Sequence, residues 1–282
     1  MKRTIAHVLA AAIFILLASV SVASEPSWTG PIDRAFRARC DESTQRYVLM
    51  LPQGFDANEP VDLVIALHGH GSDRWQFVRQ DRGECRGSRD AAARYGMIFV
   101  SPDYRAKTSW MGPDAESDVL QILDTMKDRY RIRHTIICGG SMGGTAALTF
   151  AALHPDRVDG VVALNGTANL VEYTGFQDAI SQSFGGTKKE VPEQYTRRSA
   201  ELYPERLTMP MAATVGGRDR LVPPDSVRRL FAVLKKLGRP VLLIDRPEGG
   251  HSTDYEDTTA AMRFVVEKVR STSRVEKTTS PR

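Results

Sequence analysis

Residues 135–153 read TIICGGSMGGTAALTFAAL, and the fold can be worked out from this stretch. The run from Thr135 to Cys138 is short, apolar and rich in β-branched residues, which predicts a buried strand. The small and apolar residues from Gly143 to Leu153 predict a helix. Between the two, glycines surround Ser141. The pattern G-x-S-x-G at a strand-to-helix turn indicates a nucleophilic serine rather than a plain glycine-rich turn.

The turn around Ser141 also predicts a donor for a negatively charged intermediate. Glycines two positions before and after the serine allow the crowded, strained backbone of such a turn. The turn lifts the Ser141 hydroxyl above the sheet and places the Met142 N–H at the start of the helix. An N–H in that position can donate a hydrogen bond to an oxyanion. We therefore expect Met142 to supply one half of an oxyanion hole.

Short apolar runs alternate with helical stretches on both sides of this turn. Further strands are predicted at residues 45–51, 62–67, 97–101, 158–164, 211–215 and 241–244. Further helices are predicted at residues 117–130, with Ser117 as a possible N-cap, and at 226–237 and 258–269. Repeated β-α units predict an α/β fold with a mostly parallel central sheet and helices on both of its faces.

The chain shows neither an internal repeat nor a linker, so we expect one catalytic domain over residues 24–270. Residues 165–208 are polar, rich in Gly, Ser and Tyr, and too long for a simple connection. We expect them to form an insertion with short helices after the sixth strand, over the edge of the sheet. Residues 271–282 lack apolar periodicity and predict a disordered tail.

A serine hydroxyl is a weak nucleophile and needs a general base. Of the six histidines, His251 follows a strand and the pair Gly249-Gly250, a loop that can present an imidazole above the sheet. Its place near the C-terminus agrees with the chain order nucleophile, acid, base that accompanies this kind of turn. His134 and His154 are more simply surface or capping residues. We therefore predict His251 as the base.

The carboxylate that orients the base is expected on a loop after an intervening strand. The stretch VGGRDRLVP at 215–223 fits, because a strand runs directly into a glycine turn that carries Asp219. Asp225 and Asp245 are rivals. Asp225 looks like the N-cap of a helix, and Asp245 lies at a strand end one loop before the base. We predict Asp219 as the acid.

The sequence His68-Gly69-His70-Gly71 follows a predicted strand directly. Two histidines one residue apart could chelate a metal ion, but no further ligand set completes such a site. Glycines in this loop would let the backbone approach a substrate, as in loops that supply the second oxyanion donor. We expect the His70 N–H to be that donor and His68 to be a structural histidine within the loop.

Aromatic residues mark the expected mouth of the site. Tyr104 and Trp110 follow the strand at 97–101, and we predict that both contact substrate. Trp110 could stack on a sugar or an aromatic acyl group, or it could instead pack the insertion onto the sheet. Tyr173, Phe176 and Phe184 of the insertion could line an acyl pocket or form the insertion's own core.

Composition excludes several classes of protein. The 282 residues are 41% hydrophobic and 26% charged, which is ordinary for a globular domain and excludes a wholly disordered or fibrous chain. The formal net charge of +4 is spread without a basic block, so nucleic acid is not an expected partner. Cys138 reads as a small buried hydrophobe. Cys40 and Cys85 could pair, a possibility that the sequence leaves open.

The N-terminus predicts export. Met1-Lys2-Arg3 is a short positive segment, and an apolar run from Val8 to Val22 follows it, too short for a typical membrane-spanning helix. Small residues up to Ala23 suit a signal peptidase. We expect residues 1–23 to be a signal peptide and the mature protein to be periplasmic or extracellular, without stable membrane insertion. An uncleaved anchor is the alternative.

Four motifs in order carry a resemblance: HGHG at 68–71, GGSMGG at 139–144, GGRDRLVP at 216–223 and GGHST at 249–253. Together they resemble the α/β-hydrolase superfamily over residues 45–269. More narrowly, the chain resembles secreted bacterial feruloyl and acetylxylan esterases and the catalytic domain of the prolyl oligopeptidase family. The resemblance implies a serine hydrolase without cofactor or metal, with Ser141, Asp219 and His251 as its triad.

The expected activity is that of an exported serine carboxylic ester hydrolase. It would act through an acyl-enzyme on acetyl or feruloyl esters of polysaccharide, with that ester as its partner. The alternative is a prolyl-oligopeptidase-like peptidase or acyl-peptide hydrolase. The propeller domain through which oligopeptidases admit short peptides is not seen in the sequence, which favours the esterase. A non-catalytic binding protein would not need both the serine turn and the triad.

Overall fold

The structure, a computed structural model, describes residues 28–279 and is built on an eight-stranded sheet. The strands are β1 (Trp28–Arg37), β2 (Thr44–Pro52), β3 (Val61–Leu67), β4 (Ile98–Pro102), β5 (Ile132–Gly140), β6 (Gly160–Leu164), β7 (Met211–Gly216) and β8 (Val241–Arg246). They lie in the order β1-β2-β4-β3-β5-β6-β7-β8. The strands from β3 to β8 are parallel, while β1 and β2 are antiparallel to their neighbours. The predicted α/β class is confirmed.

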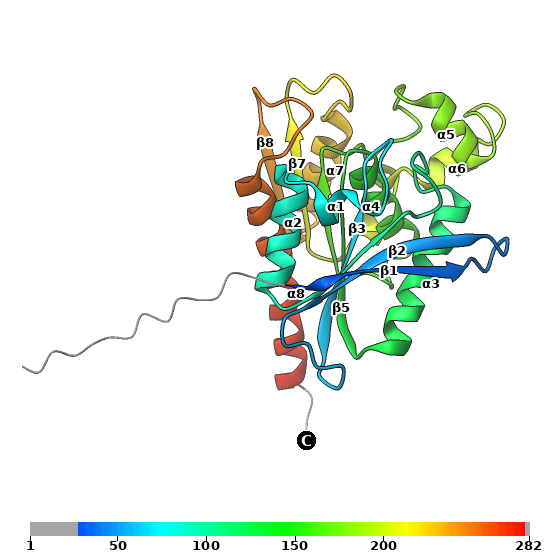
Figure 1. Cartoon of the computed structure of the whole chain (residues 1–282). Helices are drawn as coiled ribbons and strands as arrows, with labels where there is room; N and C mark the ends of the chain where they lie inside the picture. The colour runs from blue at the N-terminus through cyan, green and yellow to red at the C-terminus, as the bar shows by residue number, and fades with distance from the viewer. Residues whose placement is uncertain (1–27, 280–282) are drawn as a thin grey trace, which may run out of the picture.

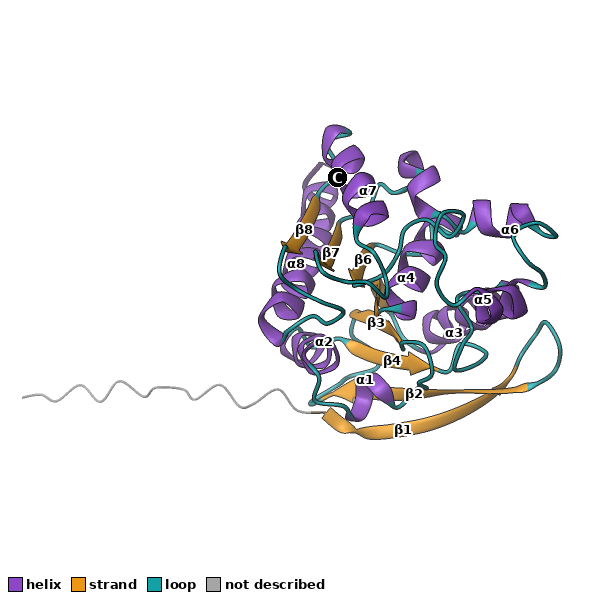
Figure 2. Ribbon diagram, turned by 90° about the horizontal axis from the view of Figure 1, so that it is seen from above, coloured by secondary structure: helices purple, strands orange, loops and turns teal. Residues whose placement is uncertain are grey.

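Helices cover both faces of this sheet (Figures 1 and 2). They are α1 (Gln76–Arg79), α2 (Gly83–Arg94), α3 (Pro113–Arg129), α4 (Met142–Leu153), α5 (Gln177–Phe184), α6 (Pro192–Arg197), α7 (Asp225–Lys236) and α8 (Tyr255–Thr279), with 3₁₀ turns η1 (Ala200–Leu202) and η2 (Pro204–Arg206). One core packs α3, α4 and α7 on the sheet, and the other packs α2 and α8 on its opposite face.

Strand β3 shows why the apolar runs are continuous. Leu63, Ile65 and Leu67 belong to the first core, whereas Val64 and Ala66 belong to the second. Because successive side chains of a strand point to opposite faces, a strand covered on both faces needs apolar residues at every position. The carboxyl ends of the parallel strands then meet along one edge of the sheet, where ligands bind in this class of fold.

Strand β1 was not predicted from the sequence. Its residues, WTGPIDRAFR, are mostly exposed and include Pro31, and the pairing with β2 shifts register between Thr29 and Ile32. Proline cannot donate to a strand ladder and is tolerated on an edge strand or at a bulge. Such a strand is held by its pairing with a neighbour, so it carries little periodicity of its own.

Helices α3 and α8 extend beyond their predicted boundaries. Helix α3 begins four residues before Ser117, because Pro113 occupies its first turn, where a missing N–H costs nothing. Helix α8 continues to Thr279, so residues 271–279 are helical rather than a tail. The segment extends a helix that residues 255–270 have already nucleated, and such an extension gains one hydrogen bond for each residue fixed, so it needs no apolar stripe of its own.

The predicted signal peptide, residues 1–23, lies outside the described residues. Over residues 28–279, none of the helices has both the length and the apolar character that a membrane span requires. All three cysteines are free thiols, so the open pairing of Cys40 with Cys85 is not formed. Cys40 is exposed, whereas Cys85 is buried in α2 and Cys138 in β5.

The insertion, residues 165–208, holds the short helices α5 and α6 and packs on the first core. Its anchor is Arg198, whose buried guanidinium donates to Met111 O (2.8 Å) and pairs with Glu116 (2.6 Å). Burial lowers the pKa of Arg198 to about 10. The insertion is thereby fixed to the loop before α3 and to the first turn of α3 itself.

Candidate active site

Ser141 stands between β5 and α4 on a strained backbone. Its φ is 57° and its ψ is −119°, a conformation that costs a non-glycine residue about 1–3 kcal/mol. The Ser141 N–H donates to Leu164 O at the end of β6 (2.8 Å). A Cβ at Gly143 would overlap the Leu67 carbonyl oxygen, so only glycine lets α4 start this close to β3. The sharp turn is therefore a product of close packing.

The structure brings Ser141, His251 and Asp219 together from three separate loops. His251 Nε2 lies 2.8 Å from Ser141 Oγ, and His251 Nδ1 lies 2.6 Å from Asp219 Oδ2. The Asp219 side chain is 1% exposed and that of His251 is 22% exposed. A buried carboxylate at Nδ1 keeps the proton there and leaves Nε2 free to accept a proton from the serine.

Both oxygens of the Asp219 carboxylate have hydrogen-bond partners. Its second oxygen, Oδ1, accepts the N–H groups of Leu221 and Val222, each at 2.9 Å. The rival carboxylates lie elsewhere: Asp245 pairs with Arg228 at 2.8 Å, and Asp225 is the first residue of α7. Of the three candidates, only Asp219 contacts the imidazole.

The predicted oxyanion loop lies beside the serine. A Cβ built on Gly69 would be 3.7 Å from Ser141 Cβ, so the two turns are adjacent. The Gly69 N–H donates to Gln76 Oε1 (2.7 Å) and the Gly71 N–H to Lys107 O (2.8 Å). These bonds fix the loop on both sides of His70, whose own N–H finds no acceptor among the described residues. Met142 opens α4, so its N–H lacks an intrahelical acceptor.

The two histidines of this loop do not share a site. His68 is buried, with Nδ1 2.9 Å from Gly69 O and Nε2 3.1 Å from Asp103 O. Burial lowers the pKa of His68, against the opposing effect of the two carbonyl contacts. His70 instead accepts a hydrogen bond from the Trp110 indole (3.1 Å). His68 thus lies where a structural histidine was predicted.

Tyr104 and Trp110 do not offer their side chains to a substrate. Tyr104 is 1% exposed and its hydroxyl donates to His68 O, while Trp110 is 0% exposed. Trp110 packs on Tyr173 and Phe176, the alternative that the sequence had left open. In this structure neither side chain is exposed for the substrate contact that was predicted, and residues of the insertion cover Trp110.

His134, His154, Tyr173 and Phe184 have structural roles. His134 Nδ1 lies 2.9 Å from buried Asp62, and His154 Nε2 lies 2.9 Å from Glu116. Tyr173 and Phe184 are buried in the first core. Phe176, by contrast, is partly exposed, and its ring centroid is 4.3 Å from that of His70.

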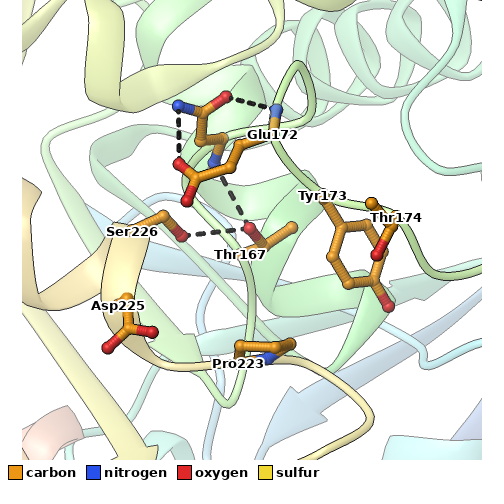
Figure 3. A pocket seen from close by; sticks show the side chains of 8 residues that line it. Thr167, Glu172, Tyr173, Thr174, Pro223, Asp225 and Ser226 are labelled. Atoms are coloured by element: carbon orange, nitrogen blue, oxygen red, sulfur yellow. Dashed lines mark hydrogen bonds between the residues drawn. The ribbon is translucent and has the colours of Figure 1, made fainter.

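A cavity of about 100 Å³ lies between residues of the insertion and the start of α7 (Figure 3). It is lined by Thr167, Asn169, Glu172, Tyr173, Thr174, Pro223, Asp225 and Ser226. None of these residues belongs to the serine array, and Thr167 Oγ1 and Ser226 Oγ bond to each other at 3.0 Å. The cavity is a neighbour of the site and does not contain it.

Two supporting residues were missed by sequence reasoning. Asn165, the first residue after β6, has φ 49° and donates through Nδ2 to Thr253 Oγ1 (2.9 Å). Thr253 Oγ1 also lies 2.6 Å from Thr214 Oγ1 of β7. An asparagine directly after a parallel strand is a weak signal for such a role, because asparagine tolerates positive φ.

The sequence matches the prolyl oligopeptidase family over residues 93–271, more than half of the chain. No curated protein matches the sequence at a significant level. Among solved structures, the fold is similar to a Bacteroides ovatus protein described as a dipeptidyl aminopeptidase IV, with 14% identity and a TM-score of 0.67. It is also similar to FphF, a fluorophosphonate-binding serine hydrolase of Staphylococcus aureus (18%, 0.65), and to a ferulic acid esterase (17%, 0.63).

The aligned lengths differ between these structures. The match covers 86% of this chain but 36% of the Bacteroides ovatus protein. It covers 85% of this chain and 98% of FphF, and 84% of this chain and 98% of the ferulic acid esterase. At these identities the likeness establishes the α/β-hydrolase fold, and the array of Ser141, His251 and Asp219 occupies the carboxyl edge of its sheet.

Proposed function

Because this chain belongs to the prolyl oligopeptidase family and is a serine hydrolase, we propose that it is a carboxylic ester hydrolase whose catalytic triad is Ser141, His251 and Asp219. The observation that carries the proposal is the unbroken hydrogen-bonded chain from Ser141 Oγ through His251 to the buried Asp219 carboxylate. That chain can increase the nucleophilicity of a hydroxyl that is otherwise weak.

In the first half of the reaction, Ser141 Oγ bonds to the ester carbonyl carbon while its proton passes to His251 Nε2. The carbonyl oxygen becomes an oxyanion that accepts the N–H groups of His70 and Met142. His251 then protonates the alcohol oxygen, the carbon–oxygen bond to the alcohol breaks, and the acyl group stays on Ser141. Asp219 stabilises the imidazolium that exists between the two transfers.

In the second half, water takes the place of the alcohol. His251 Nε2 removes a proton from the water as its oxygen bonds to the acyl carbon, and the same two N–H groups hold the oxyanion. His251 returns that proton to Ser141 Oγ as the bond from Oγ to the acyl carbon breaks. The products are the carboxylic acid and the free serine.

We propose acetyl or feruloyl esters of polysaccharide as the substrates. The similarity in fold and length to a ferulic acid esterase supports an ester. The partly exposed rings of Phe176 and His70, 4.3 Å apart beside the oxyanion loop, support an aromatic acyl group, which could pack against them. A peptidase is the second candidate, and the family match and the similarity to the Bacteroides ovatus protein favour it.

The test is a comparison of rates on para-nitrophenyl acetate, methyl ferulate, acetylated xylan and an amino-acyl para-nitroanilide, with Ser141→Ala beside the parent. Ester turnover that vanishes in Ser141→Ala, with little turnover of the anilide, would support the esterase. Anilide turnover near the ester rate would favour the peptidase. Ester turnover at the parent rate in Ser141→Ala would remove the proposed nucleophile.

We also propose that the mature protein works in the periplasm or outside the cell. The positive N-terminus, the apolar run and the small residues up to Ala23 support this. Cell fractionation followed by N-terminal sequencing tests it. A mature N-terminus near Ser24 in the exported fraction is the expected result, and full-length protein in the cytoplasm would contradict it.

A further inference from the structure

Four rings from three separate segments form a cluster next to the proposed oxyanion hole: His70, Trp110, Tyr173 and Phe176. Ring centroids are 4.3 Å apart for His70 and Phe176, 5.4 Å for Trp110 and Phe176, and 5.7 Å for Trp110 and Tyr173. Trp110 follows β4, while Tyr173 and Phe176 come from the insertion. The insertion therefore contacts the oxyanion loop directly through Phe176, and indirectly through Trp110, on which Tyr173 packs.

Trp110 contacts both residues whose N–H groups are proposed to hold the oxyanion. Its indole Nε1–H donates to His70 Nδ1 (3.1 Å), and its backbone N–H donates to Met142 Sδ (3.4 Å). An indole N–H can only donate, so Nδ1 must be the acceptor and His70 must carry its proton on Nε2. Burial lowers the pKa of His70, which keeps the ring in this neutral form.

The same cluster extends to the acid loop. The Tyr173 hydroxyl donates to Leu221 O (2.9 Å), and the Leu221 N–H donates to Asp219 Oδ1 (2.9 Å). A continuous set of contacts therefore runs from His70 through Trp110 and Tyr173 to Asp219. It joins the oxyanion loop to the carboxylate of the triad without passing through Ser141 or His251.

The backbone around this cluster is strained. Trp110, Met111 and Phe176 have φ values of 44°, 57° and 50°. Such conformations persist in non-glycine residues only where the surroundings determine them, and they gather at functional sites. Here the buried Arg198 guanidinium supports the strained turn by donating to Met111 O (2.8 Å). Packing of the insertion thus holds Trp110 in a conformation that it would not adopt alone.

We infer that Trp110 is a positioning residue for the oxyanion hole, and that the insertion acts through Trp110 and Tyr173 as a brace between the oxyanion loop and the loop of Asp219. This inference rests on the proposed roles of Ser141, His70 and Met142. A donor must face the place where the oxyanion forms, and a misdirected donor loses most of its effect in the transition state. The brace is expected to raise kcat with little influence on substrate binding.

The test is Trp110→Phe, which keeps an aromatic ring and removes the indole N–H. Trp28→Phe is the matched control. Trp28, at the start of β1, packs on Phe99 and lies away from the carboxyl ends of the parallel strands. Active sites are titrated with a fluorophosphonate so that rates refer to competent enzyme. Affinity for a trifluoromethyl ketone, which forms an oxyanion on the serine, reports the oxyanion hole directly.

We expect Trp110→Phe to lower kcat about tenfold or more, with KM within about twofold. Affinity for the trifluoromethyl ketone should fall by the same factor as kcat/KM, and Trp28→Phe should match the parent. Parent-like kcat per titrated site in Trp110→Phe would overturn the inference, as would a loss of kcat with unchanged ketone affinity. Ser141→Ala separates the two proposals, since it tests the nucleophile without involving the brace.

A second variant keeps the test decisive if Trp110→Phe does not fold. Tyr173→Phe removes only the hydroxyl that bonds to Leu221 O. We expect kcat to fall several-fold per titrated site, with KM unchanged. Tyr195→Phe is its matched control within the insertion, because the Tyr195 hydroxyl bonds to Gly186 O and Ser181 Oγ, both in the insertion itself. Equal kcat for Tyr173→Phe and the parent would show that the brace does not reach the acid loop.

Discussion

The side-chain amide of Asn165 donates a hydrogen bond of 2.9 Å to the hydroxyl of Thr253, two residues after His251. Thr253 is 5% exposed, and its hydroxyl also lies 2.6 Å from the hydroxyl of Thr214. The bond ties the end of β6 to the loop that presents the base. The imidazole is thus located by a buried polar network as well as by Asp219.

Replacing Thr253 by valine should therefore reduce both stability and activity. Valine has a similar shape but leaves the Asn165 amide and the Thr214 hydroxyl without this partner, at a cost of about 1–3 kcal/mol in the free energy of unfolding. Urea unfolding and ester kinetics measure the two effects. Thr253→Ser keeps the hydroxyl and is the control. Equal stability of Thr253→Val and Thr253→Ser would contradict this role.

Ser141 should show a conflict between activity and stability. Ser141→Ala and Ser141→Gly should both lower kcat by about 10⁴-fold or more, because the nucleophile is gone. Glycine adopts positive φ without strain, so the free energy of unfolding of Ser141→Gly, measured with urea, should exceed that of Ser141→Ala by about 1 kcal/mol. The reverse order of stability would show that the turn is not strained in solution.

The serine turn should not tolerate a side chain at Gly143. An added Cβ would overlap the Leu67 carbonyl oxygen, and neither β3 nor α4 can move without opening the core. We expect Gly143→Ala to lose about 3 kcal/mol of stability and most activity. Gly30→Ala is the control, since a Cβ there meets nothing within 4 Å. Thermal unfolding of both variants measures their stability. A Gly143→Ala variant as stable as the parent would refute the packing argument.

Asp118 should make stability depend on pH. Burial raises the pKa of Asp118 to about 7, against the opposing effect of Arg105 at 3.0 Å, and its Oδ2 finds no hydrogen-bond partner among the described residues. The folded protein therefore binds a proton at this site between about pH 4 and 7, where the unfolded chain does not. The free energy of unfolding should fall as pH rises through that window, by at most about 1.4 kcal/mol per pH unit, and then level off.

Asp118→Asn tests this sign. Asparagine does not titrate, so the variant should lose this part of the pH dependence and should gain stability relative to the parent as pH rises from 5 to 8. Urea unfolding at several pH values measures it. Asp81→Asn removes an exposed carboxylate and should follow the parent curve. A constant difference between Asp118→Asn and the parent across this range would contradict the shifted pKa.

The sequence by itself indicated the α/β class and the residues that meet at the serine. Ser141, Asp219 and His251 each stand at a strand end with glycines beside them, and that backbone requirement is local, so it leaves a mark on a short stretch of chain. The same holds for Met142 and for the loop at 68–71. Apolar runs predicted the buried strands because both faces of the sheet are covered.

Tertiary structure alone decided which way the other side chains point. Trp110 and Tyr104 follow a strand end just as the triad residues do, yet both turn inward. Trp110 does so because the insertion, anchored by Arg198, packs on it, whereas the Tyr104 hydroxyl donates to His68 O. Asn165 and Thr253 are 88 positions apart, and nothing local marks either as a partner. Contacts between distant segments depend on the register of the whole sheet, and a short stretch of sequence carries no record of that register.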